Sequence, residues 1–197
     1  MNYSVNTNQA IVDPLHKDEI IPDVIPDFTP AGIITAIYPG ERAVTLGNEL
    51  TPEQTSQRPD VHFTPNDPYK YEADDLFTLV LTDPDAPSRT DKKWSEFCHW
   101  VKTDIKLVPS PNVATTADLN NNGSTGIDYM GPGPPKDTGL HRYIFLLYKQ
   151  NRPSSNFTKV KDRQNWGYGT PGTGVAKWAK ENNLELLASN YFVCQKK

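Results

Sequence analysis

The chain has 197 residues and a formal net charge of −4, with Lys and Arg side chains scattered rather than arranged in a stripe. This length fits one well-buried domain, and the charge pattern argues against a nucleic-acid partner. Cys98 and Cys194 are too few for a disulfide framework, and no apolar run reaches the roughly 18 residues of a membrane helix or resembles a signal peptide. We expect a cytoplasmic protein.

Short apolar runs separated by prolines dominate the chain, which contains 18 prolines. Proline interrupts helices and has no amide proton for a sheet ladder, so this pattern favours short strands joined by ordered turns. About eight such runs predict a mainly β fold of the sandwich type. In chain order, the predicted strands are residues 32–38, 43–47, 61–63, 76–82, 97–107, 127–130, 142–149 and 184–193.

One or two short helices complete the prediction. Residues 173–182 carry an apolar stripe that includes Val175 and Trp178, and Thr173 is a suitable N-cap. Residues 15–20 are a second, shorter candidate. Helices therefore contribute little to the predicted fold.

Two further stretches lack signals of regular structure. Residues 109–126 carry almost no large apolar side chain, which predicts an exposed loop. Residues 1–12 contain no charged side chain, no Gly and no Pro, so they are suited to enter a cleft as an extended peptide, although such termini are commonly disordered. We therefore divide the chain into an N-terminal segment, residues 1–19, and a β-sandwich domain, residues 20–197.

Polar groups are concentrated where two predicted strands end. Asp83 follows the apolar run 76–82 and is itself followed by a proline, which places it at a strand exit. His141 opens the next long apolar run, and Tyr143 shares its face because strand side chains alternate. Residues 131–135, Gly-Pro-Gly-Pro-Pro, cannot form a central strand, and their glycines let backbone amides approach a ligand. These segments predict a rigid pocket.

The residue types indicate an anion site, with other interpretations open. A carboxylate near an imidazole favours the protonated ring, whose two N–H groups can donate to phosphate. A histidine in a strand is more often structural than a ligand contact, and residues 83–88 can be a simple turn. Asp83, His99 and His141 also match a two-histidine, one-carboxylate metal set, which is the weaker interpretation. We expect no metal and no cofactor.

Nucleotide-binding and catalytic patterns are rejected. Residues 167–172 match G-x-G-x-x-G, but polar residues precede them where a buried strand is required. Ser88 and Ser95 lie in no G-x-S-x-G nucleophile elbow. The sequence therefore predicts a binding protein rather than an enzyme.

Residues 79–100 and 129–150 resemble the two signature segments of the phosphatidylethanolamine-binding protein family, which includes Raf kinase inhibitor protein. The resemblance implies an antiparallel β-sandwich whose small pocket takes phosphate, sulfate or a phospholipid head group, with anionic phospholipids at membrane surfaces as partners. His16 and His62 lie outside both segments and are expected to be structural or surface residues. The pocket residues implied are Asp83, Asp85, Phe97, His99, Gly133, Pro134, Pro135, His141 and Tyr143.

Within the family, residues 8–13, 94–100, 165–171 and 177–192 resemble fungal inhibitors of a vacuolar serine carboxypeptidase of the carboxypeptidase Y type. This resemblance implies an inhibitory N-terminus, possible contact with a Ras GTPase-activating protein, and the vacuole as a second compartment. The alternative is a phospholipid-binding regulator of Ras or kinase signalling without a protease role. The inhibitory residues implied are Met1, Asn2, Tyr3, Ser4 and Val5.

Overall fold

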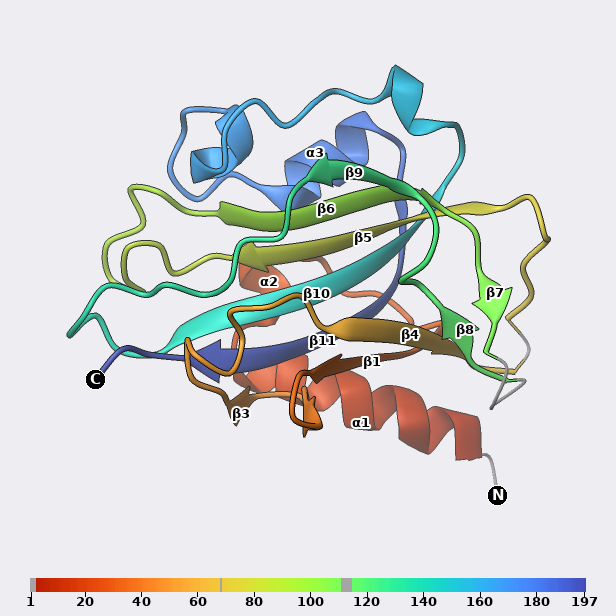
Figure 1. The fold of residues 1–197 in the computed structure, drawn as a ribbon, viewed down its shortest axis with the longest axis horizontal. Coiled ribbons are helices and arrows are strands. Elements are labelled where there is room, and N and C mark those ends of the chain that lie inside the picture. Colours follow the sequence, from red (N-terminus) through yellow and green to blue (C-terminus); the bar gives the residue numbers. More distant parts are fainter. Residues whose placement is uncertain (1–2, 68, 111–114) are drawn as a thin grey trace.

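The computed structural model describes residues 3–67, 69–110 and 115–197 as two packed β-sheets with helices on one side (Figure 1). Neighbouring strands are antiparallel except β3, which runs parallel to β11. The predicted mainly β sandwich is confirmed. One sheet has the order β2 (Arg42–Ala43), β1 (Gly32–Tyr38), β4 (Asp60–Pro65), β8 (Ala117–Asp118) and β7 (Val108–Pro109). The other has the order β3 (Asn48–Glu49), β11 (Glu185–Cys194), β10 (His141–Gln150), β5 (Leu76–Asp83), β6 (Phe97–Ile105) and β9 (Ser124–Ile127).

Helices cover the outer face of the six-stranded sheet. Their apolar side chains share one buried cluster with the outward-facing residues of β5, β6, β10 and β11. Within the described ranges, no helix is long and apolar enough to cross a membrane. The helical elements are α1 (Tyr3–Lys17), α2 (Ile20–Asp23), η1 (Ser154–Asn156), η2 (Gln164–Gly167) and α3 (Val175–Glu181).

The central strands β5 and β10 are buried on both faces. Along β10, Phe145 and Leu147 pack between the two sheets, whereas Ile144 and Leu146 pack against the helices. Alternating side chains thus serve two cores, which is why these strands appear in the sequence as continuous apolar runs. The sheet positions Asp83 and His141 at one end of this rigid centre.

The N-terminal segment differs from the prediction of an extended peptide. Helix α1 (Tyr3–Lys17) replaces it and also replaces the short helix predicted at residues 15–20. Ile11 and Leu15, four residues apart, lie on one face of α1 and are buried against the six-stranded sheet. Tertiary packing of an apolar face stabilises a helix whose sequence alone gives a weak signal. Met1 and Asn2 lie outside the described residues.

Two predicted strands were wrong in their bounds. Residues 43–47 form no continuous strand, because Leu46 and Gly47 have positive φ values of 50° and 107° and turn the chain between β2 and β3. The strand predicted at residues 127–130 lies earlier, at Ser124–Ile127. Both cases reflect short edge strands, whose pairing depends on the neighbouring strand more than on their own sequence.

The predicted exposed loop 109–126 is partly ordered and partly buried. It contributes β8 and most of β9, and Leu119 is buried in the core between the sheets. The Lys102 ammonium donates to the carbonyls of Leu119 and Asn120, both at 2.7 Å, and so ties this segment to β6. Backbone contacts of this kind compensate for the scarcity of apolar side chains. Residues 111–114 are not described.

Helix α3 (Val175–Glu181) lies within the predicted range, but its N-cap differs. Gly174 occupies the cap position and makes no side-chain cap hydrogen bond, so Thr173 is not the cap. Instead, the buried Glu96 carboxylate accepts a hydrogen bond of 3.0 Å from the Val175 amide. An acidic group at a helix start is favourable because the first amides lack partners within the helix.

Candidate functional site

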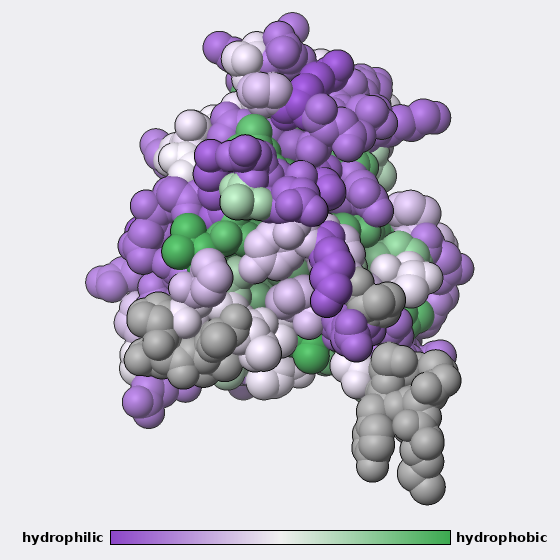
Figure 2. All heavy atoms as spheres, turned by 90° about the vertical axis from the view of Figure 1, so that its right-hand side faces the viewer, coloured by the Kyte–Doolittle hydropathy of each residue, from purple (hydrophilic) through white to green (hydrophobic). Residues whose placement is uncertain are grey.

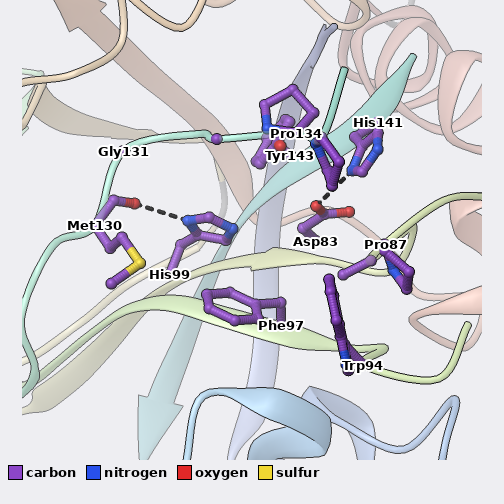
Figure 3. Close-up of a pocket in the computed structure, with 13 residues that line it drawn as sticks. Asp83, Pro87, Trp94, Phe97, His99, Met130, Gly131, Pro134, His141 and Tyr143 are labelled. Carbon is purple, nitrogen blue, oxygen red and sulfur yellow. Dashed lines mark hydrogen bonds and ion pairs between the residues drawn. The ribbon is translucent and has the colours of Figure 1, made fainter. Parts of the chain in front are cut away.

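A small cavity of about 140 Å³ opens where β5 ends and β10 and β6 begin, at the left end of the molecule in Figure 1 and enlarged in Figure 3. Its volume suits a group of a few non-hydrogen atoms rather than a whole lipid. Larger hollows exist elsewhere, but this one gathers a carboxylate and two imidazoles. The lining residues are Asp83, Ala86, Pro87, Trp94, Phe97, His99, Met130, Gly131, Gly133, Pro134, Pro135, His141 and Tyr143.

Asp83 and His141 form a buried ion pair at the inner end of the cavity. The His141 Nδ1 atom donates to the Asp83 Oδ2 atom at 2.9 Å (Figure 3). The Thr138 hydroxyl lies 2.8 Å from the other ring nitrogen, Nε2, and donates its single hydrogen to the Pro135 carbonyl at 2.7 Å. Hydrogen counting therefore makes Nε2 a donor to Thr138. Both ring N–H groups have partners within the protein, so the ring presents mainly its positive charge to the cavity.

His99 has a different hydrogen-bonding role. Its Nδ1 atom donates to the Met130 carbonyl at 2.7 Å. Burial lowers the pKa of His99, and this outweighs the opposing effect of the nearby Asp83 carboxylate. A neutral ring with its hydrogen on Nδ1 leaves Nε2 as a hydrogen-bond acceptor. The cavity therefore contains one cationic ring and one accepting ring.

Aromatic side chains form the sides of the cavity. The Phe97 ring centroid lies 4.9 Å from that of His99, and the Tyr143 ring meets His99 edge-on at 5.2 Å. Tyr143 also stacks on His141 at 6.3 Å. Burial and the Asp83 charge raise the pKa of Tyr143, so its hydroxyl stays protonated. These contacts fix the orientation of both imidazoles.

The comparisons with known proteins identify the family of this chain. Residues 40–192 match the family model described as phosphatidylethanolamine-binding protein. The chain belongs to the phosphatidylethanolamine-binding protein family. It is 49% identical to carboxypeptidase Y inhibitor of Saccharomyces cerevisiae over 100% of both chains, and 43% identical to an uncharacterized protein of the same yeast over 95% of this chain and 94% of that one.

Solved structures of family members have the same fold. The crystal structure of carboxypeptidase Y inhibitor complexed with its cognate proteinase aligns with a TM-score of 0.92 at 50% identity and covers 100% of both chains. A phosphatidylethanolamine-binding protein from Plasmodium vivax aligns with a TM-score of 0.77 at 22% identity, covering 95% of this chain and 98% of that one. The second match supports the fold alone.

Of the residues that the family resemblance implied, Asp85 is the one that does not line the cavity. Its carboxylate turns away and binds Arg142, whose Nη2 and Nε atoms donate to it at 2.8 and 2.9 Å. Burial alone would raise the pKa of Asp85, but the hydrogen bonds and charge of Arg142 outweigh it and lower the pKa. Of the two aspartates in the Asp-Pro-Asp turn, only Asp83 faces this cavity, which we call the family pocket.

Several cavity residues were missing from the predicted site. Trp94, Met130 and Pro87 were not among the predicted site residues, yet all three line the cavity. Trp94 and Pro87 lie inside the family segment 79–100, so that segment held a usable signal for them. Met130 contacts His99 through its backbone carbonyl, which no residue type could have indicated.

A buried glutamate lies close beneath the pocket. Glu96 accepts hydrogen bonds from the Thr82 hydroxyl at 3.1 Å and from the Val175 amide. Burial raises the pKa of Glu96 to about 7, and the charge of Asp83 contributes in the same direction. The carboxyl of Glu96 does not line the cavity, so we regard it as a support for the wall rather than as a ligand contact.

The other predicted groups lie elsewhere in the fold. His16 forms an exposed ion pair with Asp27 at 2.8 Å, and His62 lies on β4 in the other sheet. Within residues 3–67, 69–110 and 115–197, no cluster of three or more His, Cys, Asp or Glu side chains could hold a metal ion. The family pocket is thus separate from both remaining histidines.

The start of α1 and the strand ends that form the pocket lie at opposite ends of the long axis of the molecule (Figure 1). Figure 2 looks onto the N-terminal end, where hydrophobic side chains form separate patches within a mainly hydrophilic face. The backbone of Tyr3, Ser4 and Val5 forms the first turn of α1. The two predicted site regions therefore do not form one contiguous site.

Proposed function

We propose that this chain is a non-catalytic inhibitor of a serine carboxypeptidase of the carboxypeptidase Y type. The observation that carries the proposal is the match, over the whole of both chains, to carboxypeptidase Y inhibitor as it occurs in the complex with its proteinase. At 49% identity over the full length, most surface positions have a direct counterpart in that inhibitor. A family relationship without that complex would support only the fold.

Within the N-terminal segment, we assign the inhibitory contact to residues 1–5. Ile11 of α1 is buried, and Asn8 is anchored by a hydrogen bond from Asn66 at 2.9 Å. Residues 1–5 precede these anchors and carry no charged side chain. A segment without charged side chains enters an apolar cleft without a large desolvation cost.

Deleting residues 1–5 is expected to weaken inhibition of carboxypeptidase Y at least about 10-fold while leaving the fold intact, because a few interface residues usually carry most of the binding energy. The measurement is the inhibition constant for peptide hydrolysis. Deletion of Lys196 and Lys197, at the other end of the chain, is the matched control. Full-length protein that fails to slow hydrolysis at micromolar concentration would disprove the inhibitor function, and an unchanged constant after deletion would disprove only the N-terminal assignment.

We further propose that the family pocket binds a phosphate group, free or in a phospholipid head group. The charged His141 ring and the small volume of the cavity support this proposal. Binding of anionic head groups at a membrane surface is the second candidate function, and it needs no protease. The expected Ras GTPase-activating protein stays a prediction from the sequence resemblance.

His141→Ala is expected to weaken binding of inorganic phosphate about 10-fold or more, because the positive charge of the ring beside the anion is lost. Titration followed by NMR or calorimetry measures the change. His62→Ala, on the other sheet, is the matched control and should leave the affinity unchanged. Equal affinities for the two variants would contradict the assignment of the anion to this pocket.

A further inference from the structure

Arg163 contacts the pocket from outside the cavity. It precedes η2 and lies outside both segments that predicted the site. One terminal nitrogen, Nη1, donates to the carbonyls of Cys98 and His99, both at 3.0 Å, and the other, Nη2, donates to the Asp128 carbonyl at 2.8 Å. The backbone carbonyl of Arg163 accepts from the Cys98 amide at 2.8 Å. A single side chain thus joins three carbonyls.

These carbonyls belong to two separate walls of the pocket. Cys98 and His99 lie on β6, whereas Asp128 lies just after β9, two residues before Met130. A backbone hydrogen bond also joins the two walls, because the Met130 amide donates to the His99 carbonyl at 2.9 Å. The His99 ring in turn donates to the Met130 carbonyl. Arg163 therefore holds the segment whose carbonyl orients the His99 ring.

We infer that Arg163 is a positioning residue of the anion pocket, which fixes the Met130 segment against β6 and thereby presents the His99 Nε2 atom to the ligand as a hydrogen-bond acceptor. This inference rests on the proposed phosphate-binding function of the pocket. Since Nε2 accepts, the ligand atom that faces His99 has to carry a hydrogen. A phosphate oxygen that bears a proton meets this requirement beside the cationic His141 ring.

The planar guanidinium is suited to this task. Its N–H groups point in fixed directions, so it can bridge several carbonyls at once, whereas a lysine ammonium is a single point charge. The charged groups that face His99 are Asp83 from β5, His141 from β10 and Arg163. Burial is the main cause that lowers the pKa of His99, Asp83 opposes it, and Arg163 and His141 add to it. Arg163 therefore supports the neutral, accepting form of the ring as well as its orientation.

The test uses the full chain with Arg163→Gln and Arg163→Lys. Arg152→Gln is the matched control, because Arg152 donates to one backbone carbonyl, that of Glu181, on α3 rather than beside the pocket. The readouts are the affinity for inorganic phosphate, the pH titration of the His99 ring by NMR, and the melting temperature. The titration separates positioning from a general effect on stability.

For Arg163→Gln we expect about 10-fold weaker phosphate binding, as found when the partners that orient ligating side chains are removed, together with a rise in the His99 titration point. Arg163→Lys keeps the positive charge but loses the several fixed N–H groups of the guanidinium. It should therefore weaken phosphate binding while leaving the His99 titration point near that of the wild type. Variants that change only the melting temperature would overturn the inference. If the wild-type protein binds no phosphate, the proposed pocket function fails, and an unshifted His99 signal in Arg163→Gln would additionally refute the positioning role.

Discussion

Replacing Arg142 by methionine is expected to destabilise the protein by about 3–5 kcal/mol, because it leaves a buried carboxylate without its counter-ion. Asp85 is fully buried, and Arg142 supplies both its charge partner and three of its hydrogen bonds, one of them from the backbone amide. The same guanidinium donates to the Asp18 carbonyl at 2.9 Å and so connects the sheet to the end of α1. Loss of the guanidinium would therefore remove the contact between β10 and the end of α1.

Urea denaturation of Arg142→Met measures this free energy. Arg89→Gln is the matched control, because Arg89 forms an exposed ion pair with Glu19 and its loss should cost less than about 1 kcal/mol. The double variant Arg142→Met with Asp85→Leu should recover most of the stability, since no fully buried charge is left unpaired. Asp23, the other acidic partner of Arg142, is partly exposed and keeps Lys92 at 3.8 Å. A loss below about 1 kcal/mol in the single variant would show that water or rearrangement compensates the carboxylate.

The pH dependence of stability provides a further readout for the same pair. The pKa of Asp85 is lowered in the folded state, so the ionised carboxylate contributes stability above its unfolded pKa of about 3.9. That contribution is lost as the pH falls through the folded value. The double variant lacks both groups and should lose less stability on acidification than the wild type.

Trp166→Ala is expected to cost about 3–5 kcal/mol, the usual range for removing a large buried aromatic side chain. Trp166 is buried between η2 and the six-stranded sheet, its ring lies 5.3 Å from that of Trp178, and its Nε1 atom donates to the Thr82 hydroxyl at 3.0 Å. Both the cavity left behind and the loss of the hydrogen bond to the Thr82 hydroxyl, which keeps its bond to Glu96, contribute. Thermal and urea unfolding measure the loss.

Trp94→Ala is the matched control for this prediction. Trp94 is only partly buried, at the pocket rim, so its truncation should cost clearly less stability. Trp166→Phe keeps an aromatic ring, so its loss of stability should lie between the losses of Trp166→Ala and Trp94→Ala. Equal losses for Trp166→Ala and Trp94→Ala would mean that the helix layer does not depend on the tryptophan at its centre.

The strands that carry the site were predictable because their sequence signals are local. The apolar run before Asp83 and the run after His141 are bounded by proline and glycine, and both match β5 and β10 to within one residue. Because these strands are buried on both faces, every position in them selects an apolar or well-paired side chain. The prediction of a pocket at their ends followed from this pattern.

Other features depend on contacts that the sequence does not display. Helix α1 contains Pro14 and is stabilised by Ile11 and Leu15 packing on a sheet that is formed much later in the chain. Asp83 and Asp85 are equivalent in sequence, and only the turn geometry sends one to the cavity and the other to Arg142. The contacts of Arg163 are to carbonyls, which every residue possesses, so no motif could reveal them.

The distance between the N-terminus and the pocket has a consequence for how the protein can be used. A partner that binds at one end of the long axis leaves the other end uncovered (Figure 1). The inhibitory contact proposed for the start of the chain and the phosphate site proposed at the pocket therefore lie at opposite ends of the fold.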